Sequence, residues 1–359
     1  MVSEMNRQTG PKRWFHRHPK LTLSAFALFG SVVAIIFAEC AARVVFPQWA
    51  PGREERVKFW TYSELLGWEH LPNQRGRFNH QDFSVDVVIN SYGMRDDEYS
   101  IRRTEKRRML VLGDSFAWGF GVEHQERFSE VLENTHSDWE IINASVSGYG
   151  TDQQLLSLKS KAKEFKPDVV LLLFCENDFE NNSHAKEYWY FKPFFVVEGG
   201  KLKLQNVPIP KSTIKQRLDR FFLGRTFLGP RLYSPVERVC SLASRRVATR
   251  ETNAAGEQTM YDVTHHLITA MNDVSRKEGA QFVLVSIPTN EGKRTWLQQV
   301  AKMESIPYLP LDKYFDSTGA DVSFPHNAHW TARGHAIAAS AIDAFLRELG
   351  LFDSSKSER

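Results

Sequence analysis

The longest apolar run of the chain lies near its N-terminus. Residues 21–38, LTLSAFALFGSVVAIIFA, form 18 consecutive positions without a charged side chain. A helix of that length is about 27 Å long, close to the roughly 30 Å hydrocarbon core of a membrane. Residues 1–20 carry several Lys and Arg side chains and one acid, Glu4, which predicts a cytoplasmic tail. We therefore expect a single-pass signal anchor at 21–39 in the inner membrane, with the remaining chain in the periplasm.

Three other interpretations of this segment stay open. A cleavable signal peptide usually has an apolar region of about 7–15 residues, shorter than this one. A lipoprotein attached at Cys40 needs a small residue before the cysteine, whereas Glu39 stands there. A buried core helix is disfavoured by the basic flank.

Residues 40–107 form a lead-in segment with little periodicity. The run at 83–90, FSVDVVIN, alternates like a strand, and Asn90 to Gly93 is typical of a turn.

From residue 108 onwards the pattern becomes regular. Short apolar runs predict strands at 109–112, 140–142, 169–174 and 281–287. Helical spacing predicts helices at 127–134, 152–164, 257–277, 290–303 and 331–349, with Asp152 as an N-cap. The run 169–174, VVLLLF, is apolar at every position, which is typical of a parallel strand covered on both faces. Alternating strands and helices predict an α/β domain with a mostly parallel sheet.

The regular pattern is interrupted between about 183 and 256. Residues 194–204 predict a hairpin that turns at Gly199-Gly200, and 211–250 are basic with interleaved aromatic residues. We interpret 183–256 as an insertion in a domain of residues 108–352, followed by a disordered tail at 353–359. The basic stretch is either a solvated face over an apolar seam or a binding surface for an anionic polymer.

Composition narrows the function classes. The chain has 359 residues, is 42% hydrophobic and carries a net charge of +3, so it is globular and does not suggest a nucleic-acid binder. Three cysteines, Cys40, Cys175 and Cys240, exclude a disulfide scaffold and have no metal-ligand spacing. His326, His329 and His335 lack a neighbouring carboxylate or thiol ligand, so we predict neither a metal nor another cofactor.

Four residues of the α/β region have side chains or backbone suited to acyl transfer. Ser115, Gly148 and Asn177 follow predicted strands, and His329 precedes the last helix. Working residues of open α/β sheets lie past the carboxyl ends of the strands. A hydroxyl, an imidazole and hydrogen-bond donors are the requirements of an acyl-serine mechanism. Taken singly, each also has a structural explanation: a helix cap, a turn, a left-handed glycine or a packed ring.

Together these residues resemble the SGNH family of GDSL-type esterases. Gly113-Asp114-Ser115 is similar to its first block, with Phe116 in place of leucine. Gly148, Asn177 and His329 are similar to the second, third and last blocks and occur in family order. The resemblance implies a three-layer α/β/α, flavodoxin-like fold. It also implies that Ser115 is the nucleophile, that His329 is the base, and that Ser115 N–H, Gly148 and Asn177 form the oxyanion hole.

One position departs from the family pattern. Asn327 stands where the family usually has the aspartate that orients the histidine. An amide oxygen accepts the imidazole N–H but does not stabilise imidazolium by charge. In the serine-protease triad such an Asp-to-Asn change lowers turnover by about 10⁴. Asp321 is the alternative carboxylate that the sequence offers.

The resemblance, the anchor and the His329-Trp330 pair indicate a substrate. We expect a serine esterase or an O-acyl (acetyl) transferase that acts on an acylated cell-envelope glycan or a similar ester. Asn327 favours the alternative, a non-catalytic binding or assembly protein of the same fold.

Overall fold

The computed structural model describes residues 18–45, 55–187, 190–214, 251–315 and 320–352. Residues 1–17, most of the basic stretch 211–250 with Cys240, and the tail 353–359 lie outside these ranges. The predictions made for those segments therefore stay predictions.

A five-stranded sheet forms the centre of the molecule. Its strands are β5 (Arg107–Gly113), β6 (Trp139–Asn143), β7 (Val169–Phe174), β12 (Gln281–Ser286) and β13 (Tyr308–Pro310). They lie in the order β13-β12-β7-β5-β6, and every neighbouring pair is parallel. The predicted parallel sheet is confirmed, and β13 is a short strand that the sequence did not predict. The chain leaves β5 for β6 on one side and returns to β7 on the other, which makes the end of β5 a topological switch point.

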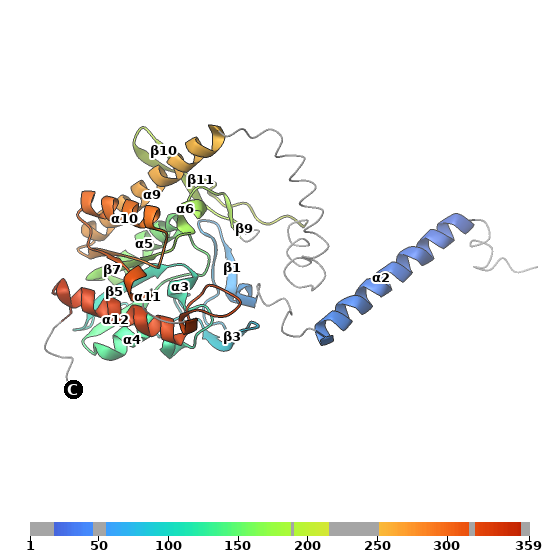
Figure 1. Ribbon diagram of the computed structural model, residues 1–359, viewed down its shortest axis with the longest axis horizontal. Helices are drawn as coiled ribbons and strands as arrows, with labels where there is room; N and C mark the ends of the chain where they lie inside the picture. The colour runs from blue at the N-terminus through green and yellow to red at the C-terminus, as the bar shows by residue number, and fades with distance from the viewer. Residues whose placement is uncertain (1–17, 46–54, 188–189, 215–250, 316–319, 353–359) are drawn as a thin grey trace, which may run out of the picture.

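Helices cover both faces of this sheet, as the apolar runs predict. Leu110 and Leu112 of β5 belong to the core beneath α5 (Thr151–Phe165), α9 (Glu251–Lys277) and α10 (Glu291–Met303). Met109 and Val111 point to the opposite core, beneath α4 (Phe128–Thr135) and α12 (Ala332–Glu348). The alternation follows from the two-residue period of a strand. The result is the expected three-layer α/β/α architecture (Figure 1).

The predicted N-cap of α5 is wrong. The helix begins at Thr151 with Gly150 as its N-cap, and Asp152 lies inside the first turn. The carboxylate of Asp152 is fully buried and pairs with Lys192 Nζ. A buried charge needs a partner of opposite sign, so this ion pair takes the side chain away from the cap.

The lead-in segment is more regular than its pattern predicts. After the short helix η2 (Glu55–Phe59), β1 (Trp60–Ser63) pairs with β2 (Gly67–His70), and β3 (Arg75–Asn79) pairs with β4 (Ser84–Val88). Only β4 was predicted. An aromatic and aliphatic cluster joins the β3–β4 hairpin to the loop after β5; its buried members are Phe59, Phe78, Val85, Val87, Ile89, Trp118 and Phe120. The lead-in segment is thus packed onto the sheet domain.

The described part of the insertion contains the predicted hairpin. β10 (Phe194–Glu198) pairs with β11 (Lys201–Gln205), and the turn lies at Gly199-Gly200, both with positive φ. Two shorter strands, β8 (Lys186–Glu187) and β9 (Tyr190–Phe191), precede it.

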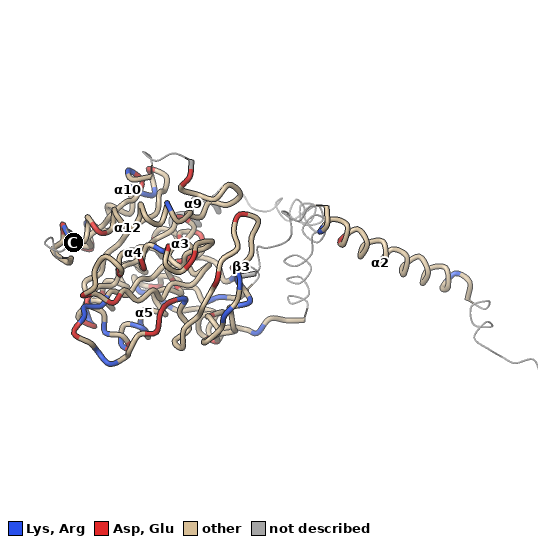
Figure 2. Tube along the Cα trace, turned by 90° about the horizontal axis from the view of Figure 1, so that it is seen from below, with Lys and Arg blue, Asp and Glu red and all other residues tan. Residues whose placement is uncertain are grey.

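The N-terminal apolar run forms the helix α2 (Pro19–Val45). None of its residues is buried, and it is long and apolar enough to cross a membrane. Figure 2 shows α2 almost without charged residues along its length. A signal sequence near an N-terminus has the same character, so this helix is a candidate for either a membrane anchor or a signal sequence.

Candidate active site

Ser115 lies directly beyond the switch point of the sheet. β5 ends at Gly113, and Asp114 caps the one-turn helix α3 (Ser115–Trp118) by accepting a 2.9 Å hydrogen bond from Phe116 N. Ser115 is the first residue of α3 and is 4% exposed. Gly113 allows this tight turn, because a Cβ there would lie 2.6 Å from Ala117 Cβ and 3.0 Å from Leu173 O.

His329 reaches Ser115 from the loop before α12. Its Nε2 lies 2.7 Å from Ser115 Oγ. The imidazole stacks on Phe120 with ring centroids 4.1 Å apart and lies 4.9 Å from the ring of Phe116. Phe116 and Phe120 both come from the turn that carries Ser115. The aromatic residue found where GDSL motifs have leucine therefore helps to hold the imidazole against the hydroxyl.

Asn327 contacts the other side of the same imidazole. Its Oδ1 accepts a hydrogen bond from the backbone N–H of His329 at 3.0 Å and lies 3.1 Å from His329 Nδ1. Two hydrogen-bond donors meet this oxygen, so Nδ1 carries the proton and Nε2 presents a lone pair to Ser115. The structure thus brings Ser115, His329 and Asn327 into one hydrogen-bonded series.

Asp321 is not the carboxylate of this series. It lies on η5 (Ala320–Val322), its side chain is 80% exposed, and its Oδ2 accepts from Arg333 at 3.3 Å. Behind Asn327 lies instead Asp82, from the turn between β3 and β4, which accepts a 2.8 Å hydrogen bond from Asn327 Nδ2. No motif marks Asp82 in the sequence.

The surroundings of His329 favour its neutral form. Burial, together with the positive charges of Arg56 and His80, lowers the pKa of His329 to about 3. Arg56 lies on η2, donates to Ser147 Oγ at 2.8 Å and has its guanidinium 5.6 Å from the ring centroid of Phe120. The imidazole is therefore unprotonated at neutral pH, the state that a general base requires.

Gly148 and Asn177 lie at the ends of the two neighbouring strands. Gly148 follows β6 with φ of +85°. Within the described ranges, the N–H groups of Ser115 and Gly148 have no hydrogen-bond acceptor. Asn177 follows β7, and its buried Oδ1 has no hydrogen-bond partner among the described residues. The two unpaired N–H groups are consistent with the oxyanion role. The unpaired Asn177 Oδ1 is an acceptor and gives that role no support, so the oxyanion hole stays a prediction.

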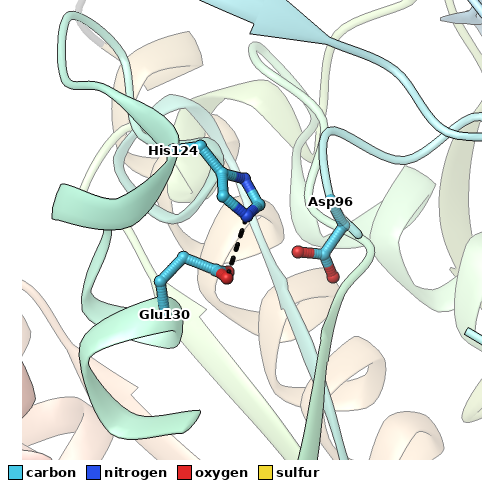
Figure 3. Close-up of side chains that lie close together, drawn as sticks. All are labelled: Asp96, His124 and Glu130. Atoms are coloured by element: carbon cyan, nitrogen blue, oxygen red, sulfur yellow. Dashed lines mark ion pairs between the residues drawn. The ribbon is translucent and has the colours of Figure 1, made fainter. Parts of the chain in front are cut away.

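A second group of titratable side chains has the composition of a metal site. One ligand atom each of Asp96, His124 and Glu130 lies within 4.8 Å of the others (Figure 3). Arg127 already donates to Asp96 Oδ1 at 2.8 Å and to Glu130 Oε1 at 2.7 Å. The guanidinium supplies the positive charge that two buried carboxylates need, so we assign this group to an internal ion-pair network.

A separate aromatic pocket lies on the lead-in side. Its volume is about 340 Å³, and Ser115 and His329 do not line it. Its aromatic walls are Trp60, Tyr62, Tyr190 and Phe191. Arg56 links it to the site, because its guanidinium lies 5.6 Å from the ring centroids of both Trp60 and Phe120.

The chain is similar to a family of known proteins and to several solved structures. A family model described as GDSL-like Lipase/Acylhydrolase matches residues 109–342, nearly two thirds of the chain. Similar solved structures include TesA, at 16% identity with a TM-score of 0.41, covering 68% of this chain and 99% of that one. The esterase EstA from Pseudoalteromonas sp. is 14% identical, with a TM-score of 0.41 and coverage of 68% and 98%. The acetyl xylan esterase AlAXEase is 13% identical, with a TM-score of 0.37 and coverage of 66% and 98%. No protein with a curated description matches the sequence.

Proposed function

The chain belongs to the family of GDSL-like lipases and acylhydrolases, which hydrolyse ester bonds, and we propose that Ser115 and His329 perform this chemistry through an acyl-serine intermediate. The observation that carries the proposal is the 2.7 Å contact between His329 Nε2 and Ser115 Oγ. A hydroxyl is a weak nucleophile unless an adjacent base accepts its proton. Here the base is neutral and its lone pair faces the hydroxyl.

The first half of the reaction forms the acyl-serine. Ser115 Oγ attacks the ester carbonyl while its proton passes to His329 Nε2. The carbonyl oxygen becomes an oxyanion, which accepts hydrogen bonds from the N–H groups of Ser115 and Gly148 and from the Asn177 amide. Imidazolium then returns the proton to the leaving alcohol as the C–O bond breaks. Donors fixed in place before the reaction stabilise the developing charge without reorganisation.

The second half releases the acyl group. Water, or a hydroxyl of an acceptor sugar, loses its proton to His329 and attacks the acyl-serine. The same donors hold the second oxyanion, and Ser115 leaves with the proton from imidazolium. Attack by water makes the protein an esterase, and attack by a sugar makes it an O-acyltransferase.

The substrate proposed here is an O-acylated cell-envelope glycan, with acetyl as the proposed acyl group. We take α2 as an inner-membrane anchor whose basic end lies in the cytoplasm, and in that orientation the α/β domain would lie in the periplasm beside such polymers. The aromatic pocket supports this substrate class because its ring faces can contact a sugar. Its wall residue Trp60 contacts Arg56, which contacts Phe120, and Phe120 stacks on His329.

A reporter fused after residue 359 tests this orientation. We expect a phosphatase that folds only in the periplasm to be active in the fusion. We expect the intact mass of the purified protein to include α2. An inactive phosphatase, together with an active cytoplasmic reporter fused at the same position, contradicts the orientation. Loss of α2 identifies that helix as a cleaved signal.

The chemistry is tested on the full chain in detergent. We expect a fluorophosphonate to label the wild type but not Ser115→Ala, and aryl-acetate hydrolysis to follow the same pattern. A folded wild type that neither labels nor hydrolyses overturns the catalytic proposal in favour of a binding protein.

Adding sugar acceptors to the same assay distinguishes esterase activity from O-acyltransferase activity. Acetyl groups recovered on the sugar indicate the transferase, and free acetate alone indicates the esterase. Trp60→Ala is expected to raise KM for a glycan ester and leave KM for the aryl acetate unchanged.

A further inference from the structure

The turn between β3 and β4 places a carboxylate behind the hydrogen-bonded series of the active site. The Asp82 side chain is only 2% exposed. Its Oδ2 accepts a hydrogen bond from Asn327 Nδ2 at 2.8 Å, and its Oδ1 lies 2.6 Å from His326 Nδ1. A buried carboxylate requires such donors, and the residue it binds is the one that contacts the His329 imidazole.

The partners of Asn327 fix which end of its amide faces His329. The backbone N–H of His329 is a donor, so the amide end that it meets is the oxygen. The carboxylate of Asp82 is an acceptor, so the end that it meets is the nitrogen. The two assignments agree, and both direct the amide oxygen towards His329 Nδ1. The shape of the amide alone does not distinguish its oxygen from its nitrogen, but these two partners do.

We propose that Asp82 is a positioning residue of the catalytic site, which supplies through Asn327 the negative charge that the usual aspartate supplies directly. This inference rests on the proposed function, because it assigns a residue to the same site. Asp82 accepts a hydrogen bond from the Asn327 amide N–H, which polarises the amide and makes its oxygen a stronger acceptor. That oxygen then better stabilises the imidazolium formed when Ser115 attacks.

The proton balance of this arrangement is simple. One proton moves from Ser115 Oγ to His329 Nε2 and later to the leaving alcohol. The proton on His329 Nδ1 stays there, and none is transferred to Asn327 or Asp82. The charged or titratable groups near the series are Asp114 beside Ser115, Arg56 and His80 near His329, and His80 and His326 beside Asp82.

Packing around the turn holds Asp82 in place. The ring of Phe83, the next residue, lies 5.4 Å from that of Phe120 and 5.2 Å from that of Phe324. Gly121 permits this approach: its φ is +92°, and a Cβ there would lie 2.6 Å from Phe324 and 2.7 Å from Phe83. The turn thus contacts both the segment after Ser115 and the loop that carries His329.

A charge exchange between positions 82 and 327 tests the proposal on the full chain. Asp82→Asn keeps one oxygen able to accept from Asn327 and removes the charge, while its NH2 group takes the place of the oxygen that faces His326. We expect it to lower kcat/KM for the aryl acetate by about 10- to 100-fold, the usual effect of losing an outer partner of a site. Asp86→Asn, four residues later with a 64% exposed side chain, is the matched control and is expected to retain wild-type activity.

The double variant Asp82→Asn/Asn327→Asp exchanges the carboxylate and the amide, so that the carboxylate contacts His329 directly. The hydrogen bonds between positions 82 and 327 and between position 327 and His329 are kept. We expect it to recover kcat/KM to within about threefold of the wild type or better. Asn327→Asp alone sets two carboxylates against each other and is expected to be less active than the double variant. Wild-type activity in Asp82→Asn overturns the proposal, as does a folded double variant no more active than Asp82→Asn.

A spectroscopic readout separates this inference from the proposed function. In protein labelled with ¹⁵N-histidine, the Nδ1–H proton of His329 is assigned by its loss in His329→Gln. We expect Asp82→Asn to move this resonance upfield or broaden it, and Asp86→Asn to leave it unchanged. An unchanged resonance in Asp82→Asn overturns the role of Asp82. An inert, unlabelled wild type overturns the proposed function instead, whatever the resonance does.

Discussion

The sheet domain and the lead-in segment contribute to one site in different ways. The sheet domain carries the proposed site residues Ser115, Gly148 and Asn177 after three adjacent parallel strands, where the topology brings loops together. The lead-in segment carries Arg56 and Asp82 on a short helix and a hairpin turn, and their side chains reach the sheet domain through hydrogen bonds.

The difference lies in what positions the residues. Strand ends are fixed by the sheet itself, so their chemistry is recognisable from the order of motifs. The β3–β4 hairpin is fixed by an aromatic cluster that includes Trp118 and Phe120 from the turn after Ser115. The lead-in segment therefore contacts the proposed active site, and the following predictions test how much each region contributes to it.

The largest effect is expected from the sheet-domain pair. Ser115→Ala and His329→Ala should each lower kcat by about 10⁵- to 10⁶-fold, since nucleophile and base act as a unit. The double variant should be no worse than either single variant in the same aryl-acetate assay. Losses that add in the double variant contradict a shared acyl-serine step.

The next effect tests whether the two regions fold as one. Phe78 is fully buried in the cluster that joins them. Phe78→Ala should lower the free energy of unfolding by about 3–5 kcal/mol in a single denaturant transition. Val88→Ala, exposed on the same hairpin, should change it by less than about 0.5 kcal/mol. Two separate transitions would show that the lead-in segment unfolds independently.

Removal of the proposed oxyanion donor should give a comparable or slightly smaller effect. Asn177→Ala removes an amide from the end of β7 and is expected to lower kcat by about 10²–10³ with little change in KM. Asn134→Ala, exposed on α4, serves as the control. A loss confined to KM would mean that Asn177 binds substrate and does not stabilise the oxyanion.

The smallest effect concerns the pH profile. Arg56 is one cause of the lowered pKa of His329, and burial is the larger cause. Since kcat/KM falls as His329 becomes protonated, the wild type should retain activity well below pH 6.5. Arg56→Gln should raise the pKa of His329 and move the acid limb to higher pH, by less than about one unit, because burial remains.

Lys58→Gln removes the same charge from the exposed face of η2 and is the control for this profile. An acid limb that moves equally in both variants indicates a general charge effect. An acid limb that moves in neither variant shows that Arg56 does not influence the pKa of His329.

Much of the sheet domain was predictable because its signals are local. The fully apolar run of β7 and the helical spacing of α10 and α12 follow from the burial that each element needs, and their ends lie within a residue or two of those expected. The N-cap at Asp152 failed for a non-local reason, because Lys192, forty residues away, binds its carboxylate. The partner strand β3 and the short strand β13 have too few apolar positions to be recognised alone.

The same division applies to the site. Residue types and their order along the chain were enough to single out Ser115, Gly148, Asn177, Asn327 and His329, since each belongs to a motif beside a strand or helix end. Asp82 lies 245 residues from Asn327 in the sequence, in a turn without a motif, and Asp321 was the nearer carboxylate to consider. Only the packed structure decides between these two acids. A buried carboxylate is retained where donors surround it, and those donors come from segments that meet only in the folded chain.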